Sequence, residues 1–203
     1  MVRINLTRDI TFPLMSLKEA IERRRSERGY SGEAMSLSEL SYLLHYAVGI
    51  TEEAHHFRAA PSAGALYPIE VYPLVNNVEG LASGIYHYVV ADHSLELVRE
   101  GDFRRELVRY ALGQEMMGEA NVVLALSSIL KRAEWRYRER AYRYVLLEAG
   151  HIGQNVYLVA TSMGLGVCGV GAYSDRGYNR LIGVDENKES VIYLLSLGKL
   201  GRR

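Results

Sequence analysis

The chain has 203 residues, of which 48% are hydrophobic, and its 24 basic and 24 acidic side chains give a formal net charge of zero. This length and apolar content predict a single globular domain over residues 1–203. The neutral charge disfavours nucleic acid as a partner, no apolar run reaches the about 20 residues of a membrane span, and the first residues lack the apolar block of a secretory signal, so we expect a cytoplasmic protein.

The N-terminal part of the sequence predicts two helices and a loop. Residues 16–25 and 36–47 each begin with Ser and carry Glu three positions later, which is the pattern of a capping box at a helix start. Residues 50–64 have no clear hydrophobic period, and we expect an ordered loop there. The adjacent His55 and His56 have no carboxylate at ligand spacing, so we expect no metal site.

A group of strands follows the loop. Residues 69–75 predict a strand, and Pro73 within it favours a sheet edge or a bulge because proline cannot donate to the ladder. Residues 85–90 and 95–99 flank a short polar turn and predict a hairpin. A helix over residues 102–112 comes next.

The C-terminal half predicts one long helix among apolar strands. Residues 121–127 predict a buried strand. Between residues 134 and 163, apolar side chains recur at alternating steps of four and three, the period of a helix. Residues 167–170 and 191–197 predict further strands, the second apolar on both faces and therefore interior. Helices and strands that mix without strict alternation predict an α+β fold.

Three arginines gather at the end of the first predicted helix. Arg24, Arg25 and Arg28 place three guanidinium groups beside the hydroxyl of Ser26 within five residues. Arginine forks match phosphate oxygens two at a time, so this turn suits an anionic ligand. A basic helix end that complements the helix dipole is the alternative explanation.

Two further segments are rich in small residues. Residues 61–68, Pro-Ser-Ala-Gly-Ala-Leu-Tyr-Pro, could let backbone N–H groups approach a ligand or could form a tight connection into the next strand. Residues 164–169 match a dinucleotide-binding pattern by letter, but a helix precedes and a strand follows, so we reject a Rossmann site. Gly171 and Ala172 could instead expose backbone to a flat ligand. Cys168 is the single cysteine, so no intrachain disulfide forms, and we expect it to be buried and unreactive.

In this order, the three segments resemble the nitroreductase-like FMN-dependent oxidoreductases. That family opens with an Arg-Arg-Ser-x-Arg motif, here residues 24–28, and continues with Pro-Ser-Ala, here residues 61–63. Its long central helix ends in Gly-Leu-Gly, here residues 164–166. The resemblance extends over residues 16–201 and implies a central mixed, mainly antiparallel sheet flanked by helices, with the long helix at a dimer interface.

The resemblance also implies roles for the arginine turn. Arg24 and Ser26 would hold the FMN phosphate, and Arg25 would lie along the ribityl and pyrimidine side. Arg28 would lie near N1 and the C2 carbonyl of the flavin as a catalytic cation. Hydride arriving at N5 leaves negative charge on that part of the ring, and a fixed positive group stabilises it.

The remaining flavin contacts that the resemblance implies come from a loop of the partner subunit, from backbone beside N5 and from the C-terminal tail. They are, in that order, Pro61, Ser62, Ala63 and Gly64, then Gly171 and Ala172, then Lys199 or Arg202. A site shared between subunits implies a homodimer with a large two-fold interface.

Residues 61–68, 135–144 and 147–155 resemble in particular the SagB-type dehydrogenase branch. Members that act on peptide azolines carry a Lys-Tyr pair where this chain has Arg136 and Tyr137. An arginine stays protonated near neutral pH and cannot act as a base, whereas the Tyr137 hydroxyl can exchange a proton. The difference disfavours azoline oxidation and keeps Tyr137 as a candidate catalytic residue.

Several functions therefore stay open. The first is an NAD(P)H-dependent flavin reductase that passes hydride to a small electrophile. The second is a SagB-like dehydrogenase that oxidises an organic substrate. A protein that stores or delivers FMN, and a scaffold without flavin, are the non-enzymatic alternatives.

Charged residues of the long helix have structural explanations as well. Glu134 with Arg138, and Glu139 with Arg143, are spaced for ion pairs on a solvated helix face. His151 adjoins the apolar stripe, and we expect it in the core or in helix packing rather than in catalysis.

Overall fold

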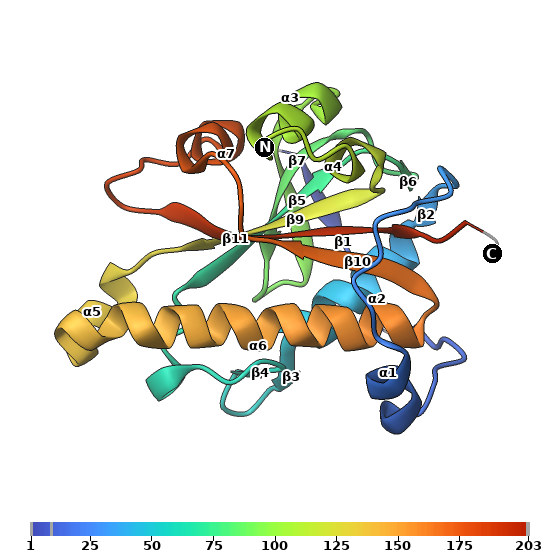
Figure 1. The fold of residues 1–203 in the computed structure, drawn as a ribbon. Coiled ribbons are helices and arrows are strands. Elements are labelled where there is room, and N and C mark those ends of the chain that lie inside the picture. Colours follow the sequence, from blue (N-terminus) through green and yellow to red (C-terminus); the bar gives the residue numbers. More distant parts are fainter. Residues whose placement is uncertain (1, 9, 202–203) are drawn as a thin grey trace.

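The computed structural model describes residues 2–8 and 10–201 (Figure 1). Its centre is a seven-stranded sheet in the order β1-β8-β7-β5-β9-β11-β10, in which all neighbouring strands are antiparallel. These strands are β1 (Arg3–Asn5), β5 (Ile69–Val75), β7 (Gly84–Val89), β8 (Ser94–Glu100), β9 (Val122–Ser128), β10 (Leu165–Val170) and β11 (Ser190–Lys199). Two short pairs lie outside this sheet, namely β2 (Met35–Ser36) with β6 (Val78–Glu79) and β3 (Ile50–Glu52) with β4 (Phe57–Arg58).

Helices cover both faces of the sheet (Figure 1). One face carries α1 (Leu17–Arg23), α2 (Leu37–Val48), α5 (Lys131–Tyr137) and α6 (Ala141–Ser162). The other face carries α3 (Arg104–Tyr110), α4 (Met116–Glu119) and α7 (Asp175–Ile182). The predicted α+β fold with a large antiparallel sheet and a long helix is confirmed, and capping boxes form at Ser16 and Ser36. Among the described residues, no helix is both long and apolar enough to cross a membrane.

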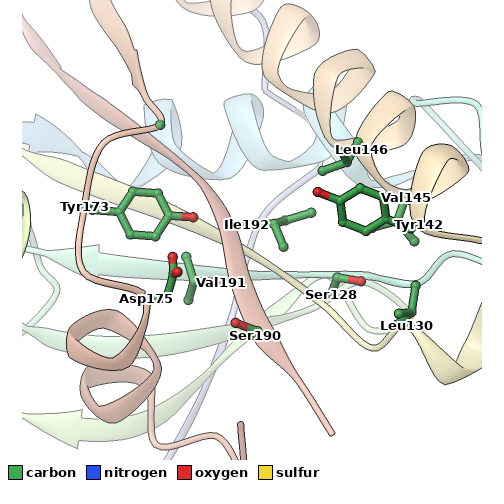
Figure 2. A pocket seen from close by; sticks show the side chains of 11 residues that line it. Ser128, Leu130, Tyr142, Val145, Leu146, Tyr173, Asp175, Ser190, Val191 and Ile192 are labelled. Carbon is green, nitrogen blue, oxygen red and sulfur yellow. The ribbon is translucent and has the colours of Figure 1, made fainter. Parts of the chain in front are cut away.

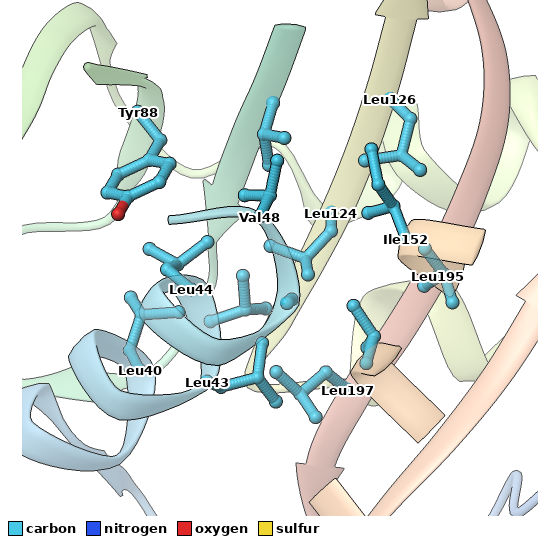
Figure 3. Close-up of a cluster of buried hydrophobic side chains, with 14 of the residues drawn as sticks. Leu40, Leu43, Leu44, Val48, Tyr88, Leu124, Leu126, Ile152, Leu195 and Leu197 are labelled. Atoms are coloured by element: carbon cyan, nitrogen blue, oxygen red, sulfur yellow. The ribbon is translucent and has the colours of Figure 1, made fainter. Parts of the chain in front are cut away.

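The core has a layer on each face of the sheet because the interior strands are apolar on both sides. Leu124 and Leu126 of β9 belong to the layer under α2 and α6, which Figure 3 shows. Val123 and Ala125 belong to the layer under α3, α4 and α7. This two-sided packing fixes α6 against the sheet and makes it the support for the candidate site.

The prediction that Pro73 marks a sheet edge is wrong. Its strand β5 is interior, with β9 on one side and β7 on the other. The ladder with β7 covers only Leu74 and Val75. Pro73 therefore lies just beyond that ladder, where a missing N–H is tolerated.

The prediction of one unbroken helix over residues 134–163 is also wrong. Arg138 has a φ of +50°, so α5 ends before it, and a short 3₁₀ turn η2 (Arg138–Arg140) leads into α6. The described residues include i,i+4 ion pairs on α1, but neither of the pairs predicted for Glu134 and Glu139. The break at Arg138 falls at one end of the Glu134–Arg138 pair, and Glu139 lies in the 3₁₀ turn, outside α6.

Candidate active site

The arginine turn lies against the C-terminal half of α6. After α1 ends at Arg23, the chain runs beside β10, where the Glu27 N–H donates to the Val167 carbonyl at 2.9 Å. The Arg24 guanidinium carbon lies 5.2 Å from the ring centroid of Tyr157 on α6. This cation–π contact holds the Arg24 charge at one flank of the helix.

Tyr157 connects the arginine turn to β10. Its hydroxyl oxygen accepts from the Gly169 N–H at 2.6 Å and lies 3.1 Å from the Ser26 hydroxyl oxygen. Because the phenol oxygen already accepts from Gly169, its own proton can go to Ser26, which leaves the Ser26 O–H available to an anion. Arg24 and Ser26 therefore present a cation and a hydroxyl donor side by side, as a phosphate group requires.

Replacing Tyr157 with Phe is expected to weaken FMN binding about 5- to 10-fold, since one hydrogen bond that orients Ser26 is worth about 1 kcal/mol. The measurement is a titration of cofactor-free protein by quenching of FMN fluorescence. Tyr46→Phe is the matched control, because Tyr46 is 41% exposed on α2. Equal FMN affinity for Tyr157→Phe and wild type would show that Tyr157 does not orient the phosphate contacts.

The other two arginines of the turn have different surroundings. Arg25 donates to two backbone carbonyls at the end of α1, at 3.0 and 2.7 Å, and so acts as a helix cap. Arg28 is exposed, donates to the Ser26 carbonyl at 3.3 Å and borders a cavity of about 350 Å³ beside residues 114–119. Arg25 therefore caps α1 and Arg28 faces a cavity, and the flavin contacts of both stay predictions.

Bare backbone at the end of β10 lies near this cavity. Gly171 and Ala172 are exposed, and no atom lies within 4 Å of the position that a Cβ on Gly171 would occupy. The Gln114 amide donates to the Ala172 carbonyl at 3.0 Å and holds the loop in place. Gly169 lacks a side chain for a packing reason, because the Tyr193 hydroxyl fills the space beside it.

The Pro-Ser-Ala loop lies beside the start of the long helical region. Gly64 has a φ of +63°, and a Cβ there would come within 2.8 Å of the Tyr137 hydroxyl and 3.0 Å of the Arg136 guanidinium. The structure therefore brings the predicted loop 61–64 and the predicted Arg-Tyr pair together, although they are far apart in the sequence.

Glu148 is a buried carboxyl group in this second cluster, and sequence reasoning missed it. The Ser62 hydroxyl donates to Glu148 Oε2 at 2.5 Å and accepts from the Tyr67 N–H at 3.0 Å. Glu148 is 4% exposed. Burial raises the pKa of its carboxyl to about 7, although the Ser62 hydrogen bond and the charge of Arg58 act in the opposite direction. An acidic residue among the apolar positions of α6 is the signal that could have identified it.

Within one chain, the two clusters lie on opposite sides of α6. Tyr157 follows Glu148 by nine positions. This spacing corresponds to about 14 Å along the helix axis and about half a turn around it. One chain thus collects Arg24, Ser26 and the Gly171–Ala172 backbone on one flank, while loop 61–64 lies on the other.

The remaining predicted residues have partners elsewhere. The Lys199 ammonium donates to Glu39 Oε1 at 2.6 Å, and Arg202 lies outside the described residues. His151 is exposed rather than buried, and it borders a cavity of about 260 Å³ together with Glu148. Cys168 is 1% exposed, as predicted. No group of three potential metal-ligating side chains occurs among the residues that the structure describes.

A cation and a hydroxyl lie beside exposed backbone, on an antiparallel sheet backed by a long helix, and this arrangement suits a ligand that carries a phosphate group. The sequence model of the Nitroreductase family matches residues 21–199, and the chain belongs to this family. It is 37% identical to a Methanocaldococcus jannaschii protein named as a nitroreductase, over 91% of both chains. It is 32% identical to the microcin B17-processing protein McbC of Escherichia coli, over 81% of this chain and 62% of McbC.

Solved structures agree with this assignment. A chain from Anabaena variabilis described as a nitroreductase has a TM-score of 0.85 and 33% identity, over 98% of this chain and 42% of that chain. A chain of the E. coli McbBCD microcin synthetase complex has a TM-score of 0.77 and 27% identity, over 97% of this chain and 78% of that chain. The present chain thus spans less than two thirds of McbC and less than half of the Anabaena chain.

These matches confirm the family, the enzyme class and the kind of cofactor. The relation to McbC and to the trifolitoxin-processing protein TfxB of Rhizobium leguminosarum confirms the resemblance to the SagB-type branch. Membership of the Nitroreductase family makes the chain an oxidoreductase with a flavin cofactor. The arginine turn and the exposed backbone of β10 fit such a group, because they supply a phosphate site and ring-facing backbone on one flank of α6.

Proposed function

We propose that this chain is an FMN-dependent oxidoreductase that transfers hydride through flavin N5 from NAD(P)H to a small electrophilic acceptor. We further propose that residues 1–203 form one flavin-binding domain and that the protein acts as a cytoplasmic homodimer. The observation that carries the proposal is the contact of Arg24 and Ser26 with Tyr157, which is bonded in turn to Gly169 just before the bare backbone of β10.

Residues of this chain provide binding, orientation and charge, and bound FMN supplies the hydride carrier. Arg24 and Ser26 bind the phosphate and set the position of the cofactor along β10. Arg28, exposed beside the cavity at residues 114–119, stabilises the negative charge that the pyrimidine side of the ring gains on reduction. Gln114 fixes the Ala172 carbonyl, and so holds the adjoining backbone in place for the N5 side.

A second copy of the chain would complete the site. Loop 61–64 lies across α6 from the arginine turn of its own chain, which favours contact with the flavin of a partner subunit. α1 and α6 also expose large apolar side chains, namely Leu17, Ile21, Tyr142, Leu146 and Leu147, which are 66%, 56%, 62%, 42% and 54% exposed. Burial of this surface favours association, and it supports α6 as the dimer interface.

A SagB-like dehydrogenase that oxidises an organic substrate is the second candidate. It is favoured by the match to McbC and by the contact of Arg136 and Tyr137 with the loop at Gly64. In this reading the Tyr137 hydroxyl would exchange the proton of the substrate, and bound FMN would supply the hydride acceptor. Lys at position 136 would be able to lose its proton, which Arg cannot do.

Changing Arg136→Lys is therefore expected to raise the rate of flavin bleaching by an azoline-containing peptide at least about tenfold above wild type, the usual scale of an added general base. Anaerobic stopped-flow absorbance measures this rate. Arg140→Lys, at an exposed arginine of η2, is the matched control. An unchanged rate for Arg136→Lys would remove position 136 from the choice of substrate.

The proposed function is tested by anaerobic mixing of the purified, FMN-loaded protein with NADH and with NADPH. Rapid loss of the oxidised-flavin absorbance supports the reductase. Loss of absorbance only with an organic donor supports the dehydrogenase instead. A protein that takes up no FMN would contradict both.

A further inference from the structure

A cavity of about 440 Å³ opens where β10 leaves the sheet, and it begins at Gly171. Beyond Val170, no described strand pairs with that edge of β11, because β10 pairs with β11 only as far as Leu194. The N-terminal turns of α6, the end of β9, the start of β11 and the loop before α7 surround the gap (Figure 2). Its size lies within the range that small-molecule sites occupy.

Two tyrosines and an apolar floor give the cavity its shape. Figure 2 shows Tyr173 on one side of β11 and Tyr142 on the other, with their hydroxyls pointing toward each other across Ile192. Val145 and Leu146 of α6 complete the apolar lining. Aromatic rings and branched side chains of this kind suit a planar ring.

One buried hydroxyl in the lining has no partner. Ser128 is 7% exposed, and its Oγ has no hydrogen-bond partner among the residues that the structure describes. Ser190 also lines the cavity, but its hydroxyl is engaged with the Asn179 amide at 3.0 Å. A buried polar atom without a partner costs about 1–3 kcal/mol, so a turn of the Ser128 side chain toward the cavity would let a ligand satisfy its hydroxyl.

The charged groups at the cavity are acidic. Asp175 lies at the end near Tyr173, and none of the described lining residues is basic. Glu189, which accepts from the Ser127 hydroxyl, adds a second carboxylate next to Ser190. The site is therefore suited to an N–H donor or a cation and unsuited to an anion.

We propose that this cavity holds the ring of the molecule that exchanges hydride with the flavin, and that it selects a planar ring bearing an N–H group or a positive charge over an anionic ring. Ser128 hydrogen-bonds to the ring substituent, and Asp175 attracts the donor or the cation. The proposal rests on the proposed function, since only a flavin beside Gly171 makes this cavity a substrate site.

Three flat probes of nearly equal size test the selection, namely benzamidine, benzamide and benzoate. Their binding to the FMN-loaded protein is followed by the shift of the flavin absorbance, and their binding to cofactor-free protein by ligand-observed NMR. Benzamidine is expected to bind at least about tenfold more tightly than benzoate, with benzamide between them. Equal or tighter binding of benzoate would overturn the proposal.

Variants assign the effect to particular residues. Asp175→Asn is expected to reduce the preference for benzamidine over benzoate about 5- to 10-fold, and Ser128→Ala to weaken benzamide about 3- to 10-fold. Glu186→Gln, at an exposed acidic residue after α7, is the control for a general charge effect. Unchanged selectivity in Asp175→Asn would contradict the proposal even if FMN binds and is reduced normally. Failure to bind FMN, with selective binding to the cofactor-free protein intact, would instead contradict the proposed function and the link of this cavity to hydride exchange, but not the selectivity of the cavity.

Discussion

Replacing Arg24 with Gln is expected to weaken FMN binding about 10- to 100-fold, the largest effect of any single change in the arginine turn. A charged hydrogen bond to phosphate contributes about 1.5–3 kcal/mol, and each 1.4 kcal/mol is a factor of about ten in affinity. The Arg24 guanidinium is already ordered over Tyr157. Less conformational entropy is therefore lost on binding, and the full value of the contact is realised.

Riboflavin separates a phosphate effect from a general loss of the site, since it carries the same ring without the phosphate. Fluorescence titrations should show that Arg24→Gln leaves riboflavin affinity within about twofold of wild type while FMN affinity falls. Arg23→Gln is the matched control, because Arg23 points away into an i,i+4 pair with Glu19. If Arg24→Gln changed FMN and riboflavin affinity equally, the phosphate contact would lie elsewhere.

The arginine turn shows why part of the site was predictable from the sequence. Its charges, the helix that ends before it and the capping box of that helix all lie within a few residues of one another, so local rules describe them. The same holds for β10 and for the exposed backbone that follows it. The helix α7 was not predicted, although it follows the cap Ser174 and ends before Gly183, which has a φ of +76°.

The parts that sequence reasoning missed depend on contacts between distant segments. Ser62, which precedes β5, meets Glu148 only because α6 packs against the sheet that contains β5. Arg138 adopts a positive φ without being glycine, so no residue type in the sequence marks the break between α5 and α6. The cavity beside Gly171 is assembled from four separate segments, and its lining has no common motif.

Two buried titratable groups are expected to oppose each other in the pH dependence of stability. His93 is 2% exposed, its Nε2 lies 2.9 Å from the Ser41 hydroxyl and its Nδ1 lies 2.7 Å from the Tyr88 hydroxyl. Because Ser41 donates to the Thr7 carbonyl at 2.7 Å, the His93 Nε2–H donates to Ser41 and Nδ1 accepts from Tyr88. The neutral ring therefore satisfies every partner, and a second proton would displace the Tyr88 hydroxyl.

The sign of each contribution follows from its pKa in the folded chain. Burial, with the nearby charges of His45 and Arg8, lowers the pKa of His93 from 6.5 to about 4. The contribution of His93 to the free energy of unfolding is therefore fully present above pH 6.5. About 3 kcal/mol of it is lost as the pH falls toward 4. Burial raises the pKa of Glu148 from 4.5 to about 7. The folded chain then holds a proton that the unfolded chain has released, so stability falls by about 3 kcal/mol as the pH rises from 4.5 to 7.

Changing Glu148→Gln should remove one of these opposing effects and reveal the other. Between pH 4.5 and 7, the unfolding free energy of the variant is expected to rise relative to wild type by about 3 kcal/mol, because only wild type must keep a buried carboxyl protonated or accept its buried charge. Urea unfolding at fixed protein concentration and at several pH values measures the difference. Carboxylates with lowered pKa, such as Glu39 and Glu70, contribute equally to both proteins and cancel.

The exposed Glu186→Gln serves as the control, and its profile should run parallel to that of wild type. If Glu148→Gln also ran parallel, Glu148 would be ionised in the folded chain, and its hydrogen bond with Ser62 would be that of an ordinary carboxylate. A rising difference would show instead that loop 61–64 is held by a carboxyl group that changes its protonation near neutral pH. The loop proposed to reach the partner's flavin would then be sensitive to pH near 7.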